Sequence, residues 1–412
     1  MLVRGLNDIA TRPGHEPIHQ EETVGVGFED KAERMGDYMN DEILTAAGTK
    51  LGLSRRVFLQ FCAGVAATLG LPADAHASIA EAIATKHRPP VIWLHFAECT
   101  GCTESMLVAE HPAIDELVLN LVSLDYHETL FAGAGHQAEA ARKSSMEANK
   151  GKYLLVVEGA IPAKDSGIYC KVGGQTAVEL VNECARDAAA VIALGSCASW
   201  GGMPSTGPNP TGCVGVGDVL KKQVVNIPGC PPNPYNFLST VVHYITYGKL
   251  PELDNQGRPK FAYARLIHEN CERRPHFDNG RFVQEFGDAG HRSGWCLYKL
   301  GCKGPETYAN CPSVLFGDAG GGCWPVGTGH PCIGCTEKGV GFERPIHGLA
   351  DLKFVTPSAA SSRVIEEQGK GVSVASAAVL AGGIGVVVGA SVAMAKNLGK
   401  GHLPEHTQHG EE

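Results

Sequence analysis

The chain has no excess of positive charge. Its 412 residues include 35 Lys and Arg against 44 Asp and Glu, which gives a formal net charge of −9. This balance offers no general argument for nucleic acid as a partner. Fifteen cysteines are too few in a chain of this length for a disulfide scaffold, which combines dense cysteine with a short chain. No internal repeat is visible, and 43% hydrophobic residues suffice for one large domain or two ordinary ones.

Residues 54–71 read SRRVFLQFCAGVAATLGL. Arg55 and Arg56 precede a mildly apolar run rich in alanine and glycine, and a small-residue cleavage site (AHA) follows at 75–77. This layout is typical of a twin-arginine export signal. An ordinary amphipathic helix with two basic residues is the alternative. The twin-arginine route carries folded proteins, so it suits a protein that acquires metal centres before export. We therefore expect a leader over 1–77 whose signal occupies 54–77.

The segment before the signal is unusual for a leader. Residues 1–53 carry ten acidic and five basic side chains and show no clear periodicity. Two interpretations stay open: translation begins at Met35 or Met39, or the protein tolerates a long leader. In both cases we expect this segment to be disordered or removed.

One long uncharged run lies near the C-terminus. Gly371 to Ala395 spans 25 residues without a charged side chain. As a helix it would be roughly 37 Å long, more than the hydrocarbon core of about 30 Å. The run predicts a transmembrane helix at 371–395 and a tail at 396–412, and Lys396 and Lys400 favour a cytoplasmic C-terminus. Its glycine and alanine content leaves a buried soluble helix as the alternative.

The first half of the remaining chain predicts an α/β domain. The runs at 91–96 (VIWLHF), 153–158 (YLLVVE) and 188–194 (AAVIAL) are apolar rather than alternating, which favours buried parallel strands. Each run is followed by a turn that carries glycine or cysteine. Because ligands collect at the carboxyl ends of strands in open α/β sheets, cysteines in these turns should converge. We predict a flavodoxin-like domain over 89–255.

The chain changes character after about residue 256. Strand-like runs vanish, and the sequence becomes rich in cysteine, glycine, proline, asparagine and tryptophan. A segment with so little apolar periodicity would need metal centres to organise it. We therefore expect an irregular second domain over 256–357.

Eleven side chains in three groups are candidate metal ligands. The first group is Cys99, Cys102, Cys197 and Cys230, the second is His268, Cys271, Cys296 and Cys302, and the third is Cys311, Cys332 and Cys335. Four thiolates in glycine- and proline-rich turns suit a [4Fe–4S] cluster, and three closely placed thiolates match a [3Fe–4S] cluster. For the second group the spacing alone leaves zinc and a cluster equally open. Structural zinc with leftover thiols is the alternative for all three groups.

These segments resemble the small subunit of nickel–iron hydrogenases. The match is collinear over 89–338 and is carried by ECTGCTES at 98–105, GSCASWGG at 195–202, PGCPPNP at 228–234, HENC at 268–271, YKLGCKGPETYANCP at 298–312 and WPVGTGHPCIGC at 324–335. The resemblance implies a row of three centres. The first group would hold a proximal [4Fe–4S] cluster, the second a distal [4Fe–4S] cluster with His268 as a ligand, and the third a medial [3Fe–4S] cluster.

The family relation implies the electron-relay subunit of a heterodimer. In that family hydrogen is split at a nickel–iron site in a separate large subunit, whose metal-binding cysteines have no counterpart in this sequence. We expect an uptake-type enzyme on the periplasmic side of the membrane, passing electrons to a cytochrome b or another quinone-linked subunit. Two alternatives remain. One is a membrane-anchored relay without a hydrogenase partner. The other is a quinone-reductase subunit, although that relative typically lacks the second and third ligand groups and the export signal.

Further positions carry expectations that depend on the resemblance. Gly101 and Gly202 stand where oxygen-tolerant relatives carry additional cysteines, which implies the ordinary oxygen-sensitive type. The family places a proline, here Pro325, where a fourth medial thiolate would bind. Because proline restrains itself and the residue before it, we expect Cys323 to be a packed thiol rather than a ligand. Glu98 is expected to cap a loop, with a role at the subunit interface or in proton transfer as the alternative.

Overall fold

The computed structural model describes residues 48, 54–72, 74–109, 121–317 and 322–352. The predicted transmembrane helix at 371–395, the tail at 396–412 and nearly all of the segment 1–53 lie outside these residues. Among the residues that are described, no helix is both long and apolar enough to cross a membrane.

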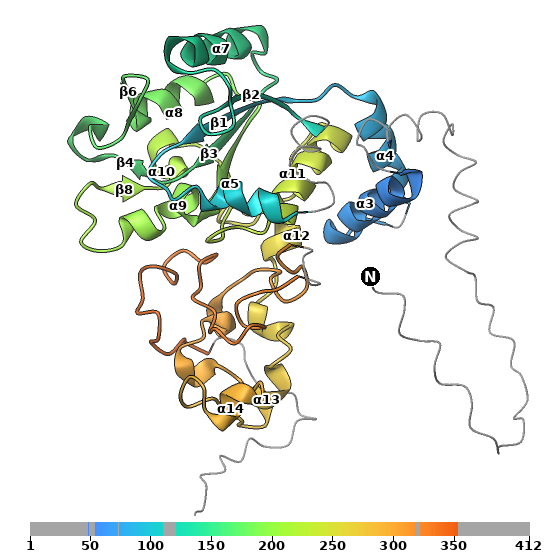
Figure 1. Ribbon diagram of the computed structural model, residues 1–412, viewed down its shortest axis with the longest axis vertical. Helices are drawn as coiled ribbons and strands as arrows, with labels where there is room; N and C mark the ends of the chain where they lie inside the picture. Colours follow the sequence, from blue (N-terminus) through green and yellow to red (C-terminus); the bar gives the residue numbers. More distant parts are fainter. Residues whose placement is uncertain (1–47, 49–53, 73, 110–120, 318–321, 353–412) are drawn as a thin grey trace, which may run out of the picture. The chain divides into compact units, whose positions relative to one another are not determined.

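The core of the chain is a five-stranded parallel sheet (Figure 1). Its strands are β1 (Pro90–His95), β2 (Ser123–His127), β3 (Leu154–Glu158), β7 (Ala190–Leu194) and β9 (Val225–Ile227), in the order β2-β1-β3-β7-β9. This is the 2-1-3-4-5 order of flavodoxin-like sheets. The three strands predicted from apolar runs are present, and they form the centre of the sheet. The two edge strands, β2 and β9, were not predicted.

The central strands are apolar because both of their faces are covered. Every residue of β3 and β7 is buried. One face packs on α8 (Ala177–Ala185), which contributes Leu180 and Val181 to the core cluster. This helix begins with a capping box in which Thr176 and Glu179 satisfy each other's backbone N–H groups. The register aligns His95, Glu158 and Leu194 at the carboxyl ends of β1, β3 and β7.

Short elements and five further helices complete the first half. The helices are α5 (Gly101–Ser105), α7 (Gly135–Ala148), α9 (Gly195–Trp200), α10 (Val216–Leu220) and α11 (Pro234–Tyr247), and the 3-10 turns are η1 (Met106–Val108), η3 (Lys164–Gly167) and η4 (Met203–Ser205). Two small antiparallel pairs join β4 (Ile161–Pro162) to β8 (Cys213–Val214) and β5 (Lys171–Val172) to β6 (Gln175–Thr176). The turns after β1, β7 and β9 carry the first ligand group. The placement after β1 and β7 is the one that the sequence predicts.

The segment predicted as an export signal forms two packed helices. Helix α3 (Arg55–Thr68) is capped by the Ser54 hydroxyl, and α4 (Ala75–Thr85) follows it. Both helices contact α11, as Figure 1 shows. Phe58 and Cys62 of α3 are fully buried, while Arg56 is exposed. The small-residue segment at 75–77, where we predict cleavage, lies in the first turn of α4.

Short turns and loops replace regular structure after α11, which agrees with the predicted irregular character of this part. Beyond α11 the described residues form isolated bridges but no further strand, with α12 (Lys260–Tyr263), η5 (Ile267–Glu269) and η7 (Gly304–Glu306) as short helical turns. Buried charges organise these loops. Arg258 pairs with Asp254 at 2.7 Å and with Glu337 at 2.8 Å.

A buried lysine holds the last described loop in place. The Lys303 ammonium group is almost fully buried and donates to the carbonyl oxygens of Gly301, Pro345, Ile346 and Gly348. Burial lowers the pKa of this amine below its ordinary value. The four carbonyl dipoles compensate for the lost hydration of the charge.

Contacts divide the chain into two compact units. The first contains residues 1–271 and 301–353, and the described part of the second is 272–300. The second unit contains α13 (Arg274–Asp278), α14 (Ala289–Arg292) and η6 (Tyr298–Leu300). Phe277, Phe282 and Tyr298 pack edge-on or tilted in its centre. The domain boundary near residue 256 stays a prediction.

Candidate metal centres

The first ligand group converges at the carboxyl end of the sheet. Cys102 lies in α5 after β1, Cys197 lies in α9 after β7, and Cys230 follows β9. Burial raises the pKa of the Cys102 thiol, and negative charge on Glu158, Cys197, Cys230 and Cys99 raises it further. The other three thiols of the group therefore lie near enough to Cys102 for their charges to act on it.

Glycines line the space between these sulfurs. A Cβ atom on Gly195 would lie 2.4 Å from the Cys102 sulfur, and one on Gly202 would lie 2.9 Å from the Cys197 sulfur. At Gly101 the corresponding distance to the Cys99 sulfur is 3.1 Å. Side chains are thus excluded from the walls of the group. Four converging thiols with glycine walls fit an iron–sulfur cluster, whose sulfides need close backbone approach.

A serine ties the loops of this group together. The Ser196 backbone N–H donates to the Gly229 carbonyl at 2.9 Å, and the Gly229 N–H donates to the Ser196 hydroxyl oxygen at 3.0 Å. The same hydroxyl donates to the Cys335 carbonyl oxygen at 2.6 Å. Ser196 therefore connects the first ligand group to the third.

The three cysteines of the third group also lie together. Burial raises the pKa of Cys311 to about 12, with Cys332 as the next cause. Burial likewise raises the pKa of Cys335 to about 12, and charge on Cys311 contributes. The Gly334 N–H donates to the Cys332 sulfur at 3.4 Å. These thiols fit a cluster with three protein ligands.

Cys323 is held by its own backbone. It is exposed and forms an antiparallel bridge with Phe316, in which the two backbone N–H groups donate across the pair at 2.8 and 3.1 Å. Pro325 follows two residues later. The expectation that Cys323 is packed is wrong, because its residue is exposed. That Cys323 is not a cluster ligand remains a prediction.

The second group is only partly brought together. His268 is buried in η5, and this turn contacts η7. A Cβ atom on Gly304 of η7 would lie 3.5 Å from the Cys302 sulfur and 3.9 Å from the His268 backbone nitrogen, so His268 and Cys302 are neighbours. Cys271 belongs to the first unit, as His268 and Cys302 do, and is the last residue of its 1–271 segment. Cys296 lies in the second unit, where its N–H donates to the Arg281 carbonyl, and its joining the other three ligands stays a prediction.

Thiols of the third group lie within electrostatic reach of thiols in both other groups. Charge on Cys230 of the first group raises the pKa of Cys335 in the third, after burial and Cys311. Charge on Cys302 of the second group raises the pKa of Cys332 after the larger effect of burial. A medial position of the third group agrees with these effects and stays a prediction.

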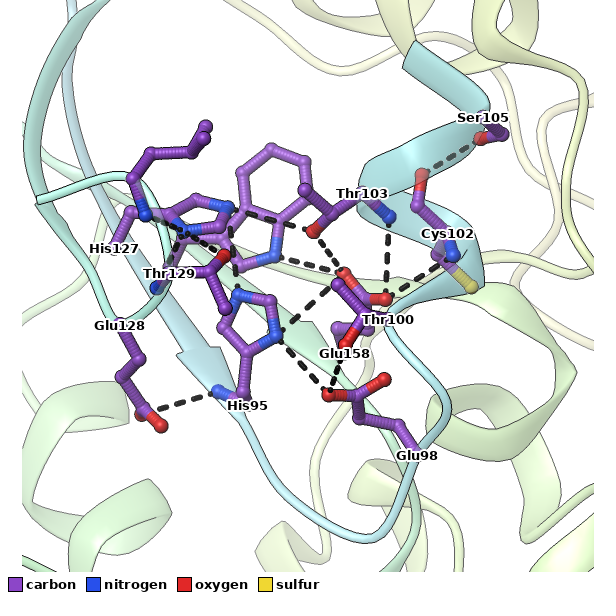
Figure 2. Close-up of polar contacts among 12 residues, drawn as sticks. His95, Glu98, Thr100, Cys102, Thr103, Ser105, His127, Glu128, Thr129 and Glu158 are labelled. Atoms are coloured by element: carbon purple, nitrogen blue, oxygen red, sulfur yellow. Dashed lines mark hydrogen bonds and ion pairs between the residues drawn. The ribbon is translucent and has the colours of Figure 1, made fainter. Parts of the chain in front are cut away.

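Sequence reasoning missed a buried network of acids and histidines beside the first group. Figure 2 shows its members around the end of β1 and β3. Glu158 is fully buried and accepts from the Cys102 N–H at 3.1 Å. The sequence carried one signal for it, a carboxylate at the end of an otherwise apolar strand. Glu98, which the sequence does single out, lies 3.4 Å from the His95 ring through its carboxylate.

Burial perturbs the acid–base properties of this network. It lowers the pKa of His127 to about 3, with the His95 charge as the second cause. It raises the pKa of Glu128 to about 7. The pKa of Glu98 is also raised, first by burial and then by Glu158. Glu98 accepts from the Thr100 hydroxyl at 3.3 Å, which agrees with a loop-holding role.

Comparison with known proteins decides the family. Residues 99–244 match the family "NADH ubiquinone oxidoreductase, 20 Kd subunit", and residues 263–346 match the C-terminal family of the "NiFe/NiFeSe hydrogenase small subunit". The hydrogenase-2 small chain of Escherichia coli K12 is 55% identical over 350 residues, which cover 85% of this chain and 94% of that one. The chain belongs to the nickel–iron hydrogenase small subunits. It is therefore one subunit of a nickel–iron hydrogenase heterodimer.

Other relatives agree with this assignment. The uptake hydrogenase small subunit of Azotobacter vinelandii is 49% identical and covers 70% of this hydrogenase small subunit and 80% of its own length. The periplasmic [NiFe] hydrogenase small subunit of Solidesulfovibrio fructosivorans is 45% identical, with coverages of 76% and 95%. Among solved structures, the Ni-Fe-Se hydrogenase of Desulfomicrobium baculatum aligns with a TM-score of 0.59 and 36% identity, covering 64% of this chain and all of that one.

Proposed function

We propose that this small subunit relays electrons from hydrogen oxidation in the large subunit to an acceptor at the periplasmic face of the membrane. The observation that supports the proposal most directly is the link between the ligand groups: the Ser196 hydroxyl donates to the Cys335 carbonyl oxygen, and charges on Cys230 and Cys302 act on Cys335 and Cys332. A relay needs redox centres close enough for electron tunnelling. Clusters held by these three groups would provide such a path within one chain.

The proposed centres are two [4Fe–4S] clusters and one [3Fe–4S] cluster. The proximal cluster would be held by Cys99, Cys102, Cys197 and Cys230, the distal one by His268, Cys271, Cys296 and Cys302, and the medial one by Cys311, Cys332 and Cys335. When bound, each cluster supplies a one-electron redox site. The chain itself would supply the ligands and the glycine walls.

The thiols also determine how the clusters are loaded. Burial raises the pKa of Cys197, Cys311 and Cys335 to about 12 each, so the thiols of the empty chain keep their protons at neutral pH. Ligands must lose these protons to bind iron. Cluster loading therefore releases protons, and the empty chain holds neutral thiols until iron arrives.

Location and acceptor extend the proposal. Arg55 and Arg56 would direct export of the loaded chain with its large subunit, and the uncharged run at 371–395 would anchor it. The acceptor would be a cytochrome b or another quinone-linked membrane subunit. Because Gly101 and Gly202 stand against the Cys99 and Cys197 sulfurs, no side chain supplements the proximal ligands there, and we propose an oxygen-sensitive enzyme.

A quinone-reductase role is the second candidate, and the match of residues 99–244 to the 20 kDa subunit family favours it. The hydrogenase-specific match at 263–346 and the 55% identical relative outweigh that finding. The first half is therefore a fold shared by both families, and the second half distinguishes them.

A matched pair of cysteine variants tests the relay. Cys335→Ser removes a proposed medial ligand, whereas Cys170→Ser changes a half-buried cysteine outside the three groups. In the purified heterodimer, Cys335→Ser should lose the [3Fe–4S] signal and slow hydrogen-driven reduction of a dye, while the large subunit still exchanges hydrogen for deuterium. Cys170→Ser should keep both activities. Normal dye reduction by Cys335→Ser would refute the relay.

A further inference from the structure

Glu158 is surrounded by hydrogen-bond donors. It ends β3 and has no exposed surface. Its Oε1 accepts from the backbone N–H groups of Cys102 and Thr103, at 3.1 and 3.2 Å. Its Oε2 accepts from the Thr103 hydroxyl at 2.6 Å and from the Trp93 ring N–H at 3.2 Å (Figure 2). Four donors and no competing acceptor fit an ionised carboxylate.

The carboxylate takes the place of a helix cap. Helix α5 begins at Gly101, and its N-cap residue Thr100 has φ 63°, with no side-chain cap hydrogen bond. The first N–H groups of a helix need partners from elsewhere. Glu158 supplies them for Cys102 and Thr103 from a neighbouring strand. A residue far away in the sequence therefore fixes the turn that carries two proximal ligands.

Two histidines lie behind Glu158. The His127 Nδ1 accepts from the Thr129 and Leu130 backbone N–H groups, both at 3.3 Å, so its proton is inferred to lie on Nε2. That nitrogen is 3.4 Å from both the His95 Nε2 and the Thr103 hydroxyl oxygen. The His95 Nδ1 is 3.4 Å from Glu98 and 3.9 Å from the Glu158 Oε2 and forms no hydrogen bond with either.

We propose that Glu158 is a positioning residue for the proximal cluster, holding the turn of Cys102 and lowering the reduction potential of the cluster. Two effects act in the same direction. The Cys102 and Thr103 N–H groups are committed to Glu158 and are not available to cluster sulfurs, and the carboxylate adds negative charge nearby. Hydrogen bonds to the cluster sulfurs raise the reduction potential, and so does nearby positive charge. Fewer hydrogen bonds to sulfur and a nearby negative charge therefore both lower the potential. This inference rests on the proposed cluster at the first ligand group.

Glu158→Gln removes the negative charge and keeps the shape of the side chain. The amide oxygen can still accept the two backbone N–H groups, but the amide nitrogen would face the Trp93 N–H, another donor. Glu128→Gln is the matched control. Glu128 is a carboxylate of the same network, yet it accepts from the His95 backbone N–H at 3.2 Å rather than from the cluster turn.

The experiment is a redox titration of the purified heterodimer, followed by electron paramagnetic resonance and paired with iron analysis. We expect Glu158→Gln to keep its iron and to show a proximal potential more positive than that of the wild type, while Glu128→Gln leaves the potential unchanged. An intact proximal cluster with the wild-type potential in Glu158→Gln would overturn the inference. A wild-type protein without a cluster at these four cysteines would instead refute the proposed function, and this is measured first.

Glu158→Asp is the second variant, in case Glu158→Gln fails to assemble. It keeps the charge but withdraws the carboxylate by one methylene, which loosens its hold on the two N–H groups. We expect iron at the first group to be lost faster to a chelator than in the wild type or in Glu128→Gln. Chelation at the wild-type rate would contradict the positioning role.

Discussion

The Ser196 hydroxyl donates a hydrogen bond to the Cys335 carbonyl oxygen at 2.6 Å. Ser196 precedes Cys197 of the first ligand group, whereas Cys335 belongs to the third group and to the other half of the chain. Charge on Cys230 of the first group also raises the pKa of Cys335, after burial and Cys311. The two halves of the first unit are therefore joined where electrons would pass from one centre to the next.

Export is the first prediction. Replacing both arginines, in an Arg55→Lys/Arg56→Lys variant, should leave the assembled heterodimer in the cytoplasm, because the twin-arginine route reads the guanidinium pair. Cell fractionation with hydrogen-dependent dye reduction measures the distribution. The variant should retain dye reduction in the cytoplasmic fraction, which shows that folding and cluster loading are intact. Normal periplasmic activity would contradict the export signal.

Packing of the signal helix gives a second prediction. Ala66 of α3 is 2% exposed, whereas Ala63 of the same helix is exposed. Ala66→Asp would bury an unpaired carboxylate, at a cost on the order of 3 kcal/mol, and Ala63→Asp should change stability by only about 0.5 kcal/mol. In a precursor retained by the arginine replacements, limited proteolysis should cut α3 faster in Ala66→Asp. Equal cleavage of both variants would show that α3 is not packed.

The buried Glu128 gives a pH-dependent prediction. Burial raises its pKa from 4.5 to about 7 in the folded chain. The folded carboxyl group therefore holds its proton more tightly than the unfolded one, and the free energy of unfolding falls as pH rises between these values. Glu128→Gln removes that loss. The variant should gain stability on the order of 1 kcal/mol at pH 8, and the gain should shrink toward pH 4.5.

The thermal midpoint of the heterodimer, measured at pH 5 and pH 8, checks this sign. A gain for Glu128→Gln that is the same at both pH values would contradict the assignment. His127 is expected to act in the opposite sense. Its pKa of about 3 lies below the ordinary value of 6.5, so its contribution to stability is lost as pH falls through that interval.

Electron exit gives the fourth prediction. Six basic side chains lie near the proposed distal ligands in the sequence: Arg273, Arg274, His276, Arg281, Arg292 and Lys299. Of these, Arg273 is buried and donates to the Trp295 carbonyl at 2.9 Å. Arg274 pairs with Asp278 at 2.8 Å. Among the six basic side chains, the exposed ones are Arg281, Arg292 and Lys299. A surface role therefore belongs to these three and not to Arg273.

A reversal of charge at this surface tests its role. Arg281→Glu/Lys299→Glu should slow electron delivery to an acidic acceptor, and added salt should narrow the difference from the wild type, because screening weakens exposed charges. Arg273→Ala should instead lower stability through the lost contact to Trp295. Electron delivery that is indifferent to both salt and the double substitution would rule out steering.

The sequence predicts the centre of the fold better than its edges. Strands β1, β3 and β7 are buried on both faces, so their apolar runs are unmistakable. Strand β2 reads SLDYH, and its first three residues are only half-buried, while β9 has three residues. Edge strands satisfy fewer packing constraints and therefore leave a weaker pattern. The flavodoxin-like class of the domain could be anticipated, but these two strands could not.

The sequence also predicts one part of the candidate site and misses another. Cysteine spacing with strand-end placement predicts the first group, and in the structure the charges of its other three thiols act on Cys102. Nothing in the spacing of Trp93, His95, His127 and Glu158 predicts their meeting, because they come from three strands and meet only through the register of the sheet. Such networks depend on tertiary structure, and a single sequence carries little signal for them.

The most direct test of the relay is an iron count combined with electron paramagnetic resonance of the oxidised, purified heterodimer. Two [4Fe–4S] clusters and one [3Fe–4S] cluster require about eleven irons in the small subunit and one stoichiometric [3Fe–4S] signal. Cys323→Ser should change neither, since its side chain is not a proposed ligand. About twelve irons, no [3Fe–4S] signal and the loss of one iron in Cys323→Ser would contradict the account of the medial centre.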